Sequence, residues 1–125
     1  MTSDPLRYGK EAEKAAEAHL SRKGYRILGR NVRYPQGELD IVAEVGETVV
    51  FVEVKARRSD TFGGPAYSVT RLKEQKLVQL ASLYIGQHRL EDRPCRFDVI
   101  LIQGDIPRSS SLEHIENAFE MTNPG

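Results

Sequence analysis

Two β-branched segments separated by a single Gly-Glu pair constrain this chain more than any other feature. Residues 38–45 have the sequence Glu-Leu-Asp-Ile-Val-Ala-Glu-Val and residues 48–55 have Thr-Val-Val-Phe-Val-Glu-Val-Lys, with Gly46 and Glu47 between them. β-Branched and aromatic residues favour strands, and glycine in the first position of a two-residue connection is typical of a type II′ hairpin turn. The sequence therefore predicts an antiparallel hairpin whose turn fixes its register.

The hairpin register brings acidic side chains together. With a two-residue turn, Asp40 lies directly across from Glu53. The neighbouring pair on the same face joins Glu38 to Lys55, because alternate residues of a strand point to the same side. The apolar side chains of the two strands then form a core face on the other side, made of Leu39, Ile41, Val50, Val52 and Val54.

Two carboxylates in this arrangement repel each other. Like charges placed across a ladder destabilise a sheet, and a hard divalent cation, which prefers carboxylate oxygens, removes the repulsion. We therefore expect Asp40 and Glu53 to bind Mg²⁺ or Mn²⁺. Lys55 would then be placed to hold an attacking water or to stabilise negative charge on a scissile phosphate. The alternative is a solvent-facing sheet with mixed charges, because Glu-x-Lys alone is a common pattern.

The segments around the hairpin predict a mixed α/β domain. A helix from Asp4-Pro5 to Gly24 has a capping residue before proline at its start and a glycine at its end. The remaining predicted elements are a helix over residues 70–85, strands over 25–33 and 97–102, and a last element of open type, an edge strand by preference, over 112–119. The order αβββαβ makes a three-stranded antiparallel meander, and the second helix crosses over to add a further strand to a mixed sheet.

Composition limits the class of protein. A chain of 125 residues with 39% apolar and 29% charged residues is expected to form one domain, residues 1–125, and is too apolar for a disordered protein. Its apolar runs are too short to span a membrane, and its first residues lack the apolar core of a signal peptide. A single cysteine, Cys95, excludes an internal disulfide and a cysteine-based zinc site. These features predict a cytoplasmic protein.

The basic residues are clustered although the formal net charge is zero. Between residues 18 and 37 the only charged side chains are Arg22, Lys23, Arg26, Arg30 and Arg33. Two further clusters are Lys55 with Arg57 and Arg58, and Arg71 with Lys73 and Lys76. If these clusters converge on one side, the surface is locally basic while the sum stays neutral. The alternative is that each cluster is a solvated face.

The motifs of the hairpin resemble a known family. Gly37-Glu-Leu-Asp40-Ile-Val, followed by Phe51-Val-Glu53-Val-Lys55-Ala-Arg57, is similar to the YraN family of predicted endonucleases. That family belongs to the PD-(D/E)xK, restriction-endonuclease-like superfamily and is akin to archaeal Holliday junction resolvases. The resemblance covers nearly the whole chain, through Gly24-Tyr-Arg-Ile-Leu with Asn31, Ser68-Val-Thr-Arg, Arg96-Phe-Asp98-Val and Asn117-Ala-Phe119. It implies a restriction-endonuclease-like fold and metal-dependent cleavage of nucleic acid.

The resemblance also implies roles for individual residues. Asp40 and Glu53 would be metal ligands, with the Val54 carbonyl oxygen as a third ligand. Lys55 would be the catalytic lysine. Glu13 matches the acidic residue that the family carries on its first helix.

Glu13 is also notable from the helical pattern alone. It shares a stripe with Gly9, Ala16 and Leu20, where a buried carboxylate is unfavourable unless it has a partner. The alternative is that Glu13 lies at the solvent-exposed edge of this stripe.

Two lysines of the second predicted helix lie on the side of its leucines, at its N-terminal end. We expect Lys73 and Lys76 to reach the carboxylates or a phosphate, the alternative being that their stems cover apolar surface while the amines stay in water. Asp98, close to Arg96, is expected to form a structural ion pair, and the three histidines lack the spacing of metal ligands. The residues expected to contact nucleic acid are Arg26, Arg30, Arg33, Arg57, Arg58, Lys73 and Lys76.

These observations predict a Mg²⁺-dependent endonuclease, with Glu38 supporting the metal site. Its substrate is expected to be DNA rather than RNA, at branched or single-stranded structures in repair or recombination. The alternatives are a non-catalytic nucleic-acid-binding module that retains the nuclease fold, and a structural partner of repair proteins. A homodimer is expected by analogy with the resolvases.

Overall fold

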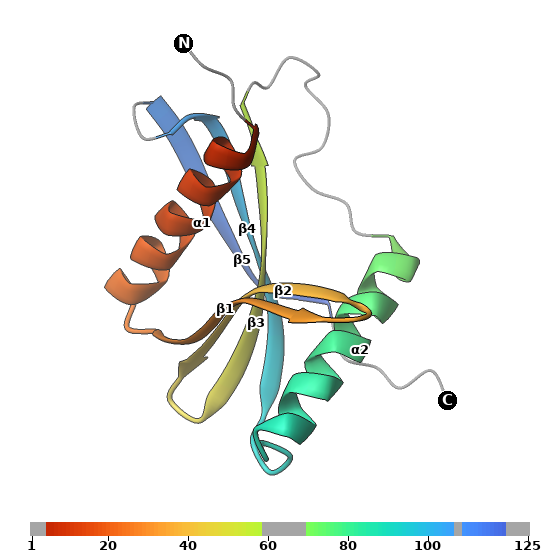
Figure 1. Cartoon of the computed structure of the whole chain (residues 1–125). Helices are drawn as coiled ribbons and strands as arrows, with labels where there is room; N and C mark the ends of the chain where they lie inside the picture. Colours follow the sequence, from red (N-terminus) through yellow and green to blue (C-terminus); the bar gives the residue numbers. More distant parts are fainter. Residues whose placement is uncertain (1–4, 59–69, 107–108, 120–125) are drawn as a thin grey trace.

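The computed structural model describes residues 5–58, 70–106 and 109–119. These residues form two helices and five strands, arranged as in Figure 1. Their bounds are α1 Pro5–Arg22, β1 Arg26–Tyr34, β2 Gly37–Val45, β3 Thr48–Arg57, α2 Arg71–Gln87, β4 Cys95–Asp105 and β5 Ser109–Phe119. The predicted elements are therefore confirmed. The last one, whose type the sequence left open, is the edge strand β5.

The strands form one mixed sheet in the order β1-β2-β3-β4-β5. The pairs β1–β2 and β2–β3 are antiparallel, which is the predicted meander. Strand β4 pairs parallel to β3, and β5 returns antiparallel to β4. A parallel neighbour requires a crossover connection, and α2 provides it. The predicted mixed α/β class with a crossover helix is confirmed.

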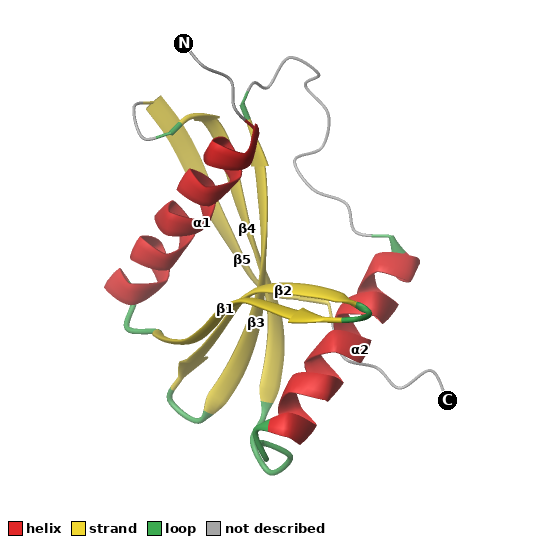
Figure 2. Ribbon diagram, viewed as in Figure 1, coloured by secondary structure: helices red, strands yellow, loops and turns green. Residues whose placement is uncertain are grey.

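Each face of the sheet is covered by one helix (Figure 2). The α1 face has small residues, Ala12 and Ala16, which let the helix lie close to Val50 and Ile100 of the sheet. On the other face, α2 packs its buried side chains against a second apolar cluster, which contains Leu77, Leu80, Ala81, Tyr84, Phe51 and Phe97. The core face expected for the hairpin is confirmed for Ile41, Val50, Val52 and Val54, which pack on the α1 side. Leu39 packs on the α2 side instead, where the sheet is buried as well.

Helix α2 begins with a side-chain cap and buries a narrower face than its pattern suggests. The hydroxyl of Thr70 accepts a hydrogen bond from the Lys73 N–H at 3.1 Å, which satisfies a backbone donor of the first turn. Leu72 and Leu83, expected on the core side, are 76% and 36% exposed.

No helix among the described residues is both long and apolar enough to cross a membrane.

The buried carboxylate of Asp98 ties β4 to β5. Asp98 is 1% exposed and accepts hydrogen bonds from Arg96 at 2.8 and 2.9 Å, from His114 Nε2 at 2.8 Å and from the Asn117 N–H at 2.9 Å. Burial opposes ionisation, but the bonds from His114, Arg96 and Asn117 outweigh it and lower the pKa of Asp98 to about 2. The expected Arg96–Asp98 ion pair is confirmed, while the part played by His114 was not foreseen.

The low pKa of Asp98 predicts a loss of stability in acid. A carboxyl group with a pKa lowered on folding stabilises the fold above its unfolded pKa, and this stabilisation disappears as the pH falls through the folded pKa. Asp98 should therefore contribute about 2 kcal/mol to the free energy of unfolding near neutral pH, lost as the pH falls from about 4 to about 2.

Urea unfolding of wild type, Asp98→Asn and the exposed control Asp92→Asn across this pH range measures the effect. Asp98→Asn should be destabilised and should lose this part of the acid dependence, whereas Asp92→Asn should follow the wild type. Equal acid profiles for wild type and Asp98→Asn would contradict the assignment.

Candidate functional site

The hairpin forms with the predicted register, but it ends earlier than expected. Val45 pairs with Thr48, and Gly46 has the positive φ of 59° that the turn requires. The β2–β3 ladder stops at the pair Ile41–Val52, so the expected pairing of Asp40 with Glu53 and of Glu38 with Lys55 is wrong.

The ladder ends because β2 changes the face that it presents. Leu39 packs in the α2-side cluster, whereas Ile41, two residues later, packs in the α1-side cluster. Regular alternation would place both side chains on one face. Strand β2 continues to pair with β1 beyond this point, through Val32–Leu39 and Arg33–Glu38. The β1–β2 ribbon therefore leaves β3 at Asp40.

Beyond the last ladder pair, the Asp40 side chain replaces the β2 backbone as a hydrogen-bond acceptor for β3. One of its carboxylate oxygens, Oδ2, accepts a hydrogen bond of 2.9 Å from the Val54 N–H. The N–H and C=O groups of one strand residue point to the same edge of the strand. The carbonyl oxygen of Val54 therefore faces the side on which Asp40 lies.

The environment of Asp40 opposes its negative charge. Burial and the nearby Glu53 raise its pKa to about 7, with Glu13 and Glu38 adding to the effect, and the bond from the Val54 N–H only partly compensates. Four carboxylates from α1, β2 and β3 thus converge at the end of the hairpin. Glu13 and Glu53 thus each lie close enough to Asp40 to oppose its charge, although the predicted ladder pairing of Asp40 with Glu53 is absent.

A cleft of about 470 Å³ opens on the α1 side of Asp40. Its lining includes Glu13 from α1, with Val54 and Arg58 at the end of β3. The sequence left open whether Glu13 lies in the core or at the exposed edge of the helix stripe. In the structure Glu13 is half-buried and lines this open cleft.

Asn31 holds Glu13 and was missed as a site residue. Its Nδ2 donates a hydrogen bond of 3.1 Å to Glu13 Oε1. Its backbone has a φ of 47°, in the left-handed region, which asparagine tolerates better than most residues. The position of the Asn31 side chain depends on this backbone conformation, which the pattern of apolar residues does not predict.

On the α2 side, Glu53 is paired with a lysine. Lys73 Nζ lies 3.4 Å from Glu53 Oε2, and the Glu53 side chain is 11% exposed. The expectation that Lys73 reaches the carboxylates is confirmed. Lys55 is exposed and points to the same face as Glu53, two residues earlier in the strand. Lys76 is exposed and forms no ion pair with another described residue.

The donor set fits a hard divalent cation in its chemistry. Among the described residues, no three His, Cys, Asp or Glu side chains are already placed to hold a metal ion. Asp40, Glu53 and the Val54 carbonyl nevertheless offer only oxygen donors, which Mg²⁺ and Mn²⁺ prefer and supplement with water. The repulsion that raises the pKa of Asp40 is of the kind that a bound cation relieves.

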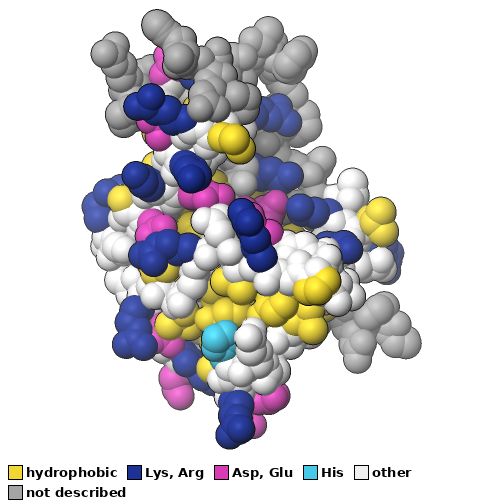
Figure 3. Space-filling view, in the orientation of Figure 1, with side chains coloured by type: hydrophobic (Ala, Val, Ile, Leu, Met, Phe, Trp, Pro, Cys, Tyr) yellow, Lys and Arg dark blue, Asp and Glu magenta, His cyan; other side chains and the backbone are white. Residues whose placement is uncertain are grey.

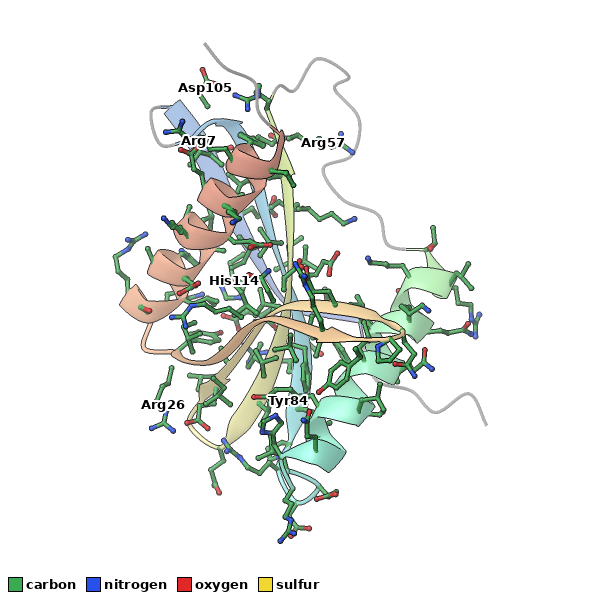
Figure 4. All side chains as sticks on the ribbon, viewed as in Figure 1. Arg7, Arg26, Arg57, Tyr84, Asp105 and His114 are labelled. Carbon is green, nitrogen blue, oxygen red and sulfur yellow. The ribbon has the colours of Figure 1, made fainter. Side chains whose placement is uncertain are left out.

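The basic stretch of the sequence does not form an uncompensated surface. Arg26 pairs with Glu44 at 3.0 Å, Arg30 with Glu17 at 2.8 Å and Arg33 with Glu38 at 2.9 Å. Arg26 also lies at the opposite end of the molecule from Arg57 (Figure 4). The expected convergence of all basic clusters is therefore wrong. Arg57 is exposed, and Arg58 lies 4.3 Å from the ring centre of Tyr8 and 3.6 Å from Asp105.

The raised pKa of Asp40 predicts that the metal-free protein loses stability as the pH rises. A carboxyl group with a raised folded pKa favours the folded state only while it is protonated. Its ionisation therefore lowers the free energy of unfolding between about pH 4 and pH 7, by roughly 4 kcal/mol.

Asp40→Asn in EDTA should remove this decline and should unfold at a higher temperature than wild type at pH 8, as measured by circular dichroism. Asp92→Asn is the matched exposed control. A wild-type stability that does not change over this range would show that Asp40 carries no such charge penalty.

Comparison with solved structures gives a distant likeness. SfsA from Pyrococcus furiosus, in complex with Ca²⁺, aligns with 90% of this chain at 17% sequence identity and a TM-score of 0.42. The chain corresponds to 64% of the length of SfsA.

Comparison with known sequences gives close relatives. A UPF0102 protein of Thermodesulfovibrio yellowstonii is 49% identical over 91% of this chain and 96% of its own length. A UPF0102 protein of Moorella thermoacetica is 48% identical over 95% of this chain and 100% of its own length. The model of the uncharacterised protein family UPF0102 matches residues 12–102. The chain therefore belongs to the UPF0102 family, which is the YraN family that its motifs resemble.

Proposed function

We propose that this protein is a metal-dependent nuclease that hydrolyses phosphodiester bonds of nucleic acid, DNA rather than RNA, on a restriction-endonuclease-like fold. The observation that supports this most is the convergence of Asp40 with Glu53 and Glu13 at the end of the hairpin, where the pKa of Asp40 rises to about 7. Titratable groups whose pKa values are strongly shifted cluster at functional sites.

The residues of the site have separate tasks in this proposal. Asp40, Glu53 and the Val54 carbonyl would hold Mg²⁺ or Mn²⁺. The bound ion would supply positive charge for the phosphate and make a bound water more acidic. Lys55 would donate hydrogen bonds to the phosphate oxygens as negative charge grows on them. Glu13, held by Asn31 at 3.1 Å, would accept a proton from the attacking water or orient it.

Lys73 gives the site an internal cation. At 3.4 Å from Glu53 Oε2 it compensates part of the carboxylate charge of the protein without metal. Because its side chain is 43% exposed, it can move into solvent or onto a phosphate with little loss of packing. A solvent-facing sheet with random charges would not place a lysine against an acid whose side chain is only 11% exposed.

Metal binding should be visible as a change in thermal stability. A ligand that binds only the folded state stabilises it by RT ln(1 + [L]/Kd). Millimolar Mn²⁺ or Mg²⁺ should raise the melting temperature of wild type by about 2–5 °C. Asp40→Asn should abolish most of this rise, and Asp92→Asn, exposed and distant in the turn before β4, should keep it. An unchanged wild-type melting temperature would remove the metal from the proposal.

Lys55 should serve the chemistry more than the affinity. Its single amine adds one phosphate contact among several, so Lys55→Ala should leave binding of DNA within a few-fold while cleavage falls by 10²-fold or more. Lys76→Ala removes another exposed lysine, one expected only to contact the nucleic acid, and should keep most of the cleavage at saturating DNA. The assay uses single-stranded, duplex, flap and four-way DNA with Mg²⁺ and with Mn²⁺.

The results of the binding and cleavage assays distinguish a nuclease from a non-catalytic binding module. Tight, salt-sensitive binding without cleavage of any substrate would favour a non-catalytic module. Equal losses of binding and cleavage in Lys55→Ala would make Lys55 a phosphate anchor. A homodimer stays a prediction, checked by sedimentation of the full chain.

A further inference from the structure

Helix α1 carries cations without an ion-pair partner in the described part of the chain, outside the basic stretch of the sequence. Among the described residues, Lys10 and Lys14 of α1 form no ion pair, and Arg7 approaches Glu11 only at 3.8 Å. These three basic residues are spaced by three and four positions, so they form one stripe on the helix surface. Figure 3 shows basic side chains gathered over the upper part of the molecule, where α1 begins in the orientation of Figure 1.

The stripe borders a groove. An open groove of about 610 Å³ is lined by Leu6, Arg7, Lys10, Glu11, Lys14 and Arg33. Four of these six residues are basic, and the single acid, Glu11, lies beside Arg7. A concave basic surface of this kind concentrates polyanions.

The groove adjoins the candidate site on the same helix. Glu13, which lines the cleft of Asp40, lies in sequence between Lys10 and Lys14, which line the groove. Arg33 connects the two from the other side, because it lines the groove and pairs with Glu38, one of the carboxylates that act on Asp40. A strand with one phosphate at Asp40 would therefore bring its neighbouring phosphates to the groove.

We propose that the groove lined by Arg7, Lys10, Lys14 and Arg33 binds the sugar–phosphate backbone of nucleic acid next to the candidate site, with Lys10 and Lys14 making the phosphate contacts. The proposal rests on the proposed function for the identity of the polyanion. Lys10 and Lys14 are separated by roughly 6 Å along the helix axis, which is comparable with the distance between neighbouring phosphates of a strand. Each lysine can therefore contact its own phosphate.

The ion-paired arginines do not compete for this role. Arg26 and Arg30 are held by Glu44 and Glu17 at 3.0 and 2.8 Å, so a phosphate would have to displace a carboxylate from each of them. The release of counterions that drives binding to nucleic acid comes from cations that are not already neutralised. Lys10 and Lys14 should therefore contribute more to binding than Arg26 and Arg30.

The test compares two double variants of the full chain with the same change in charge. Lys10→Gln/Lys14→Gln removes the two unpaired lysines, and Arg26→Gln/Arg30→Gln removes two paired arginines. Binding of a fluorescent oligonucleotide in EDTA, where cleavage does not interfere, is measured between 50 and 500 mM salt. The lysine variant should lower the slope of log Kd against log salt by about 1.4 to 1.8 and weaken binding on the order of tenfold or more at 0.1 M salt.

The matched arginine variant should change the slope by less than half as much. An equal or larger effect of the arginine variant would overturn the proposal, as would wild-type protein that binds anionic vesicles but no oligonucleotide. Cleavage by wild type is measured separately with Mg²⁺ and Mn²⁺. Lysine-dependent binding without cleavage would reject the nuclease and keep the groove, whereas cleavage with lysine-independent binding would do the reverse.

Discussion

The hydrogen bond from the Val54 N–H to the Asp40 carboxylate, 2.9 Å long, is the contact on which the candidate site depends. It lies just beyond the last β2–β3 pair, Ile41–Val52. From there onward β3 keeps only its parallel neighbour β4, with which it stays paired through Arg57. One edge of β3 is thus freed within the fold, and its backbone groups meet side chains instead of a strand. An uninterrupted hairpin would have used the Val54 N–H and carbonyl for pairing and left no opening between the helices.

The buried Asp98 and the half-buried Asp40 show how strongly the surroundings of a carboxyl group set its pKa. Asp98 has an arginine, a histidine and a backbone N–H as donors, and its pKa falls to about 2. Asp40 has one backbone donor and three neighbouring carboxylates, and its pKa rises to about 7. Asp98 is explained by stability alone, because its carboxylate oxygens accept four hydrogen bonds. Asp40 weakens the metal-free fold, and perturbed groups of this kind cluster at functional sites.

The parts that follow from local rules were predictable from the sequence. Strand period and a two-residue turn set the hairpin register from Val45–Thr48 to Ile41–Val52, because both act over a few residues. The departure of β2 at Asp40 was not predictable, since it depends on Leu39 packing against α2 while Ile41 packs against α1. The exposure of Leu72 and Leu83 has a similar cause, because the sheet leaves room for only part of the apolar stripe of α2.

The partners of the ion pairs could not be predicted from the sequence. They change which basic residues are available to bind a polyanion. Residues 18–37 contain no acid, yet Arg26 and Arg30 meet Glu44 and Glu17, which come from β2 and α1. Helix α1, by contrast, mixes both signs, and its lysines still stay without ion pairs among the described residues, because Glu13 and Glu17 turn toward β1. A chain of zero net charge can therefore have a basic groove, because its acidic residues form ion pairs and hydrogen bonds away from that groove. In this protein the partners of those acids, and not the count of arginines, decide where such a groove lies.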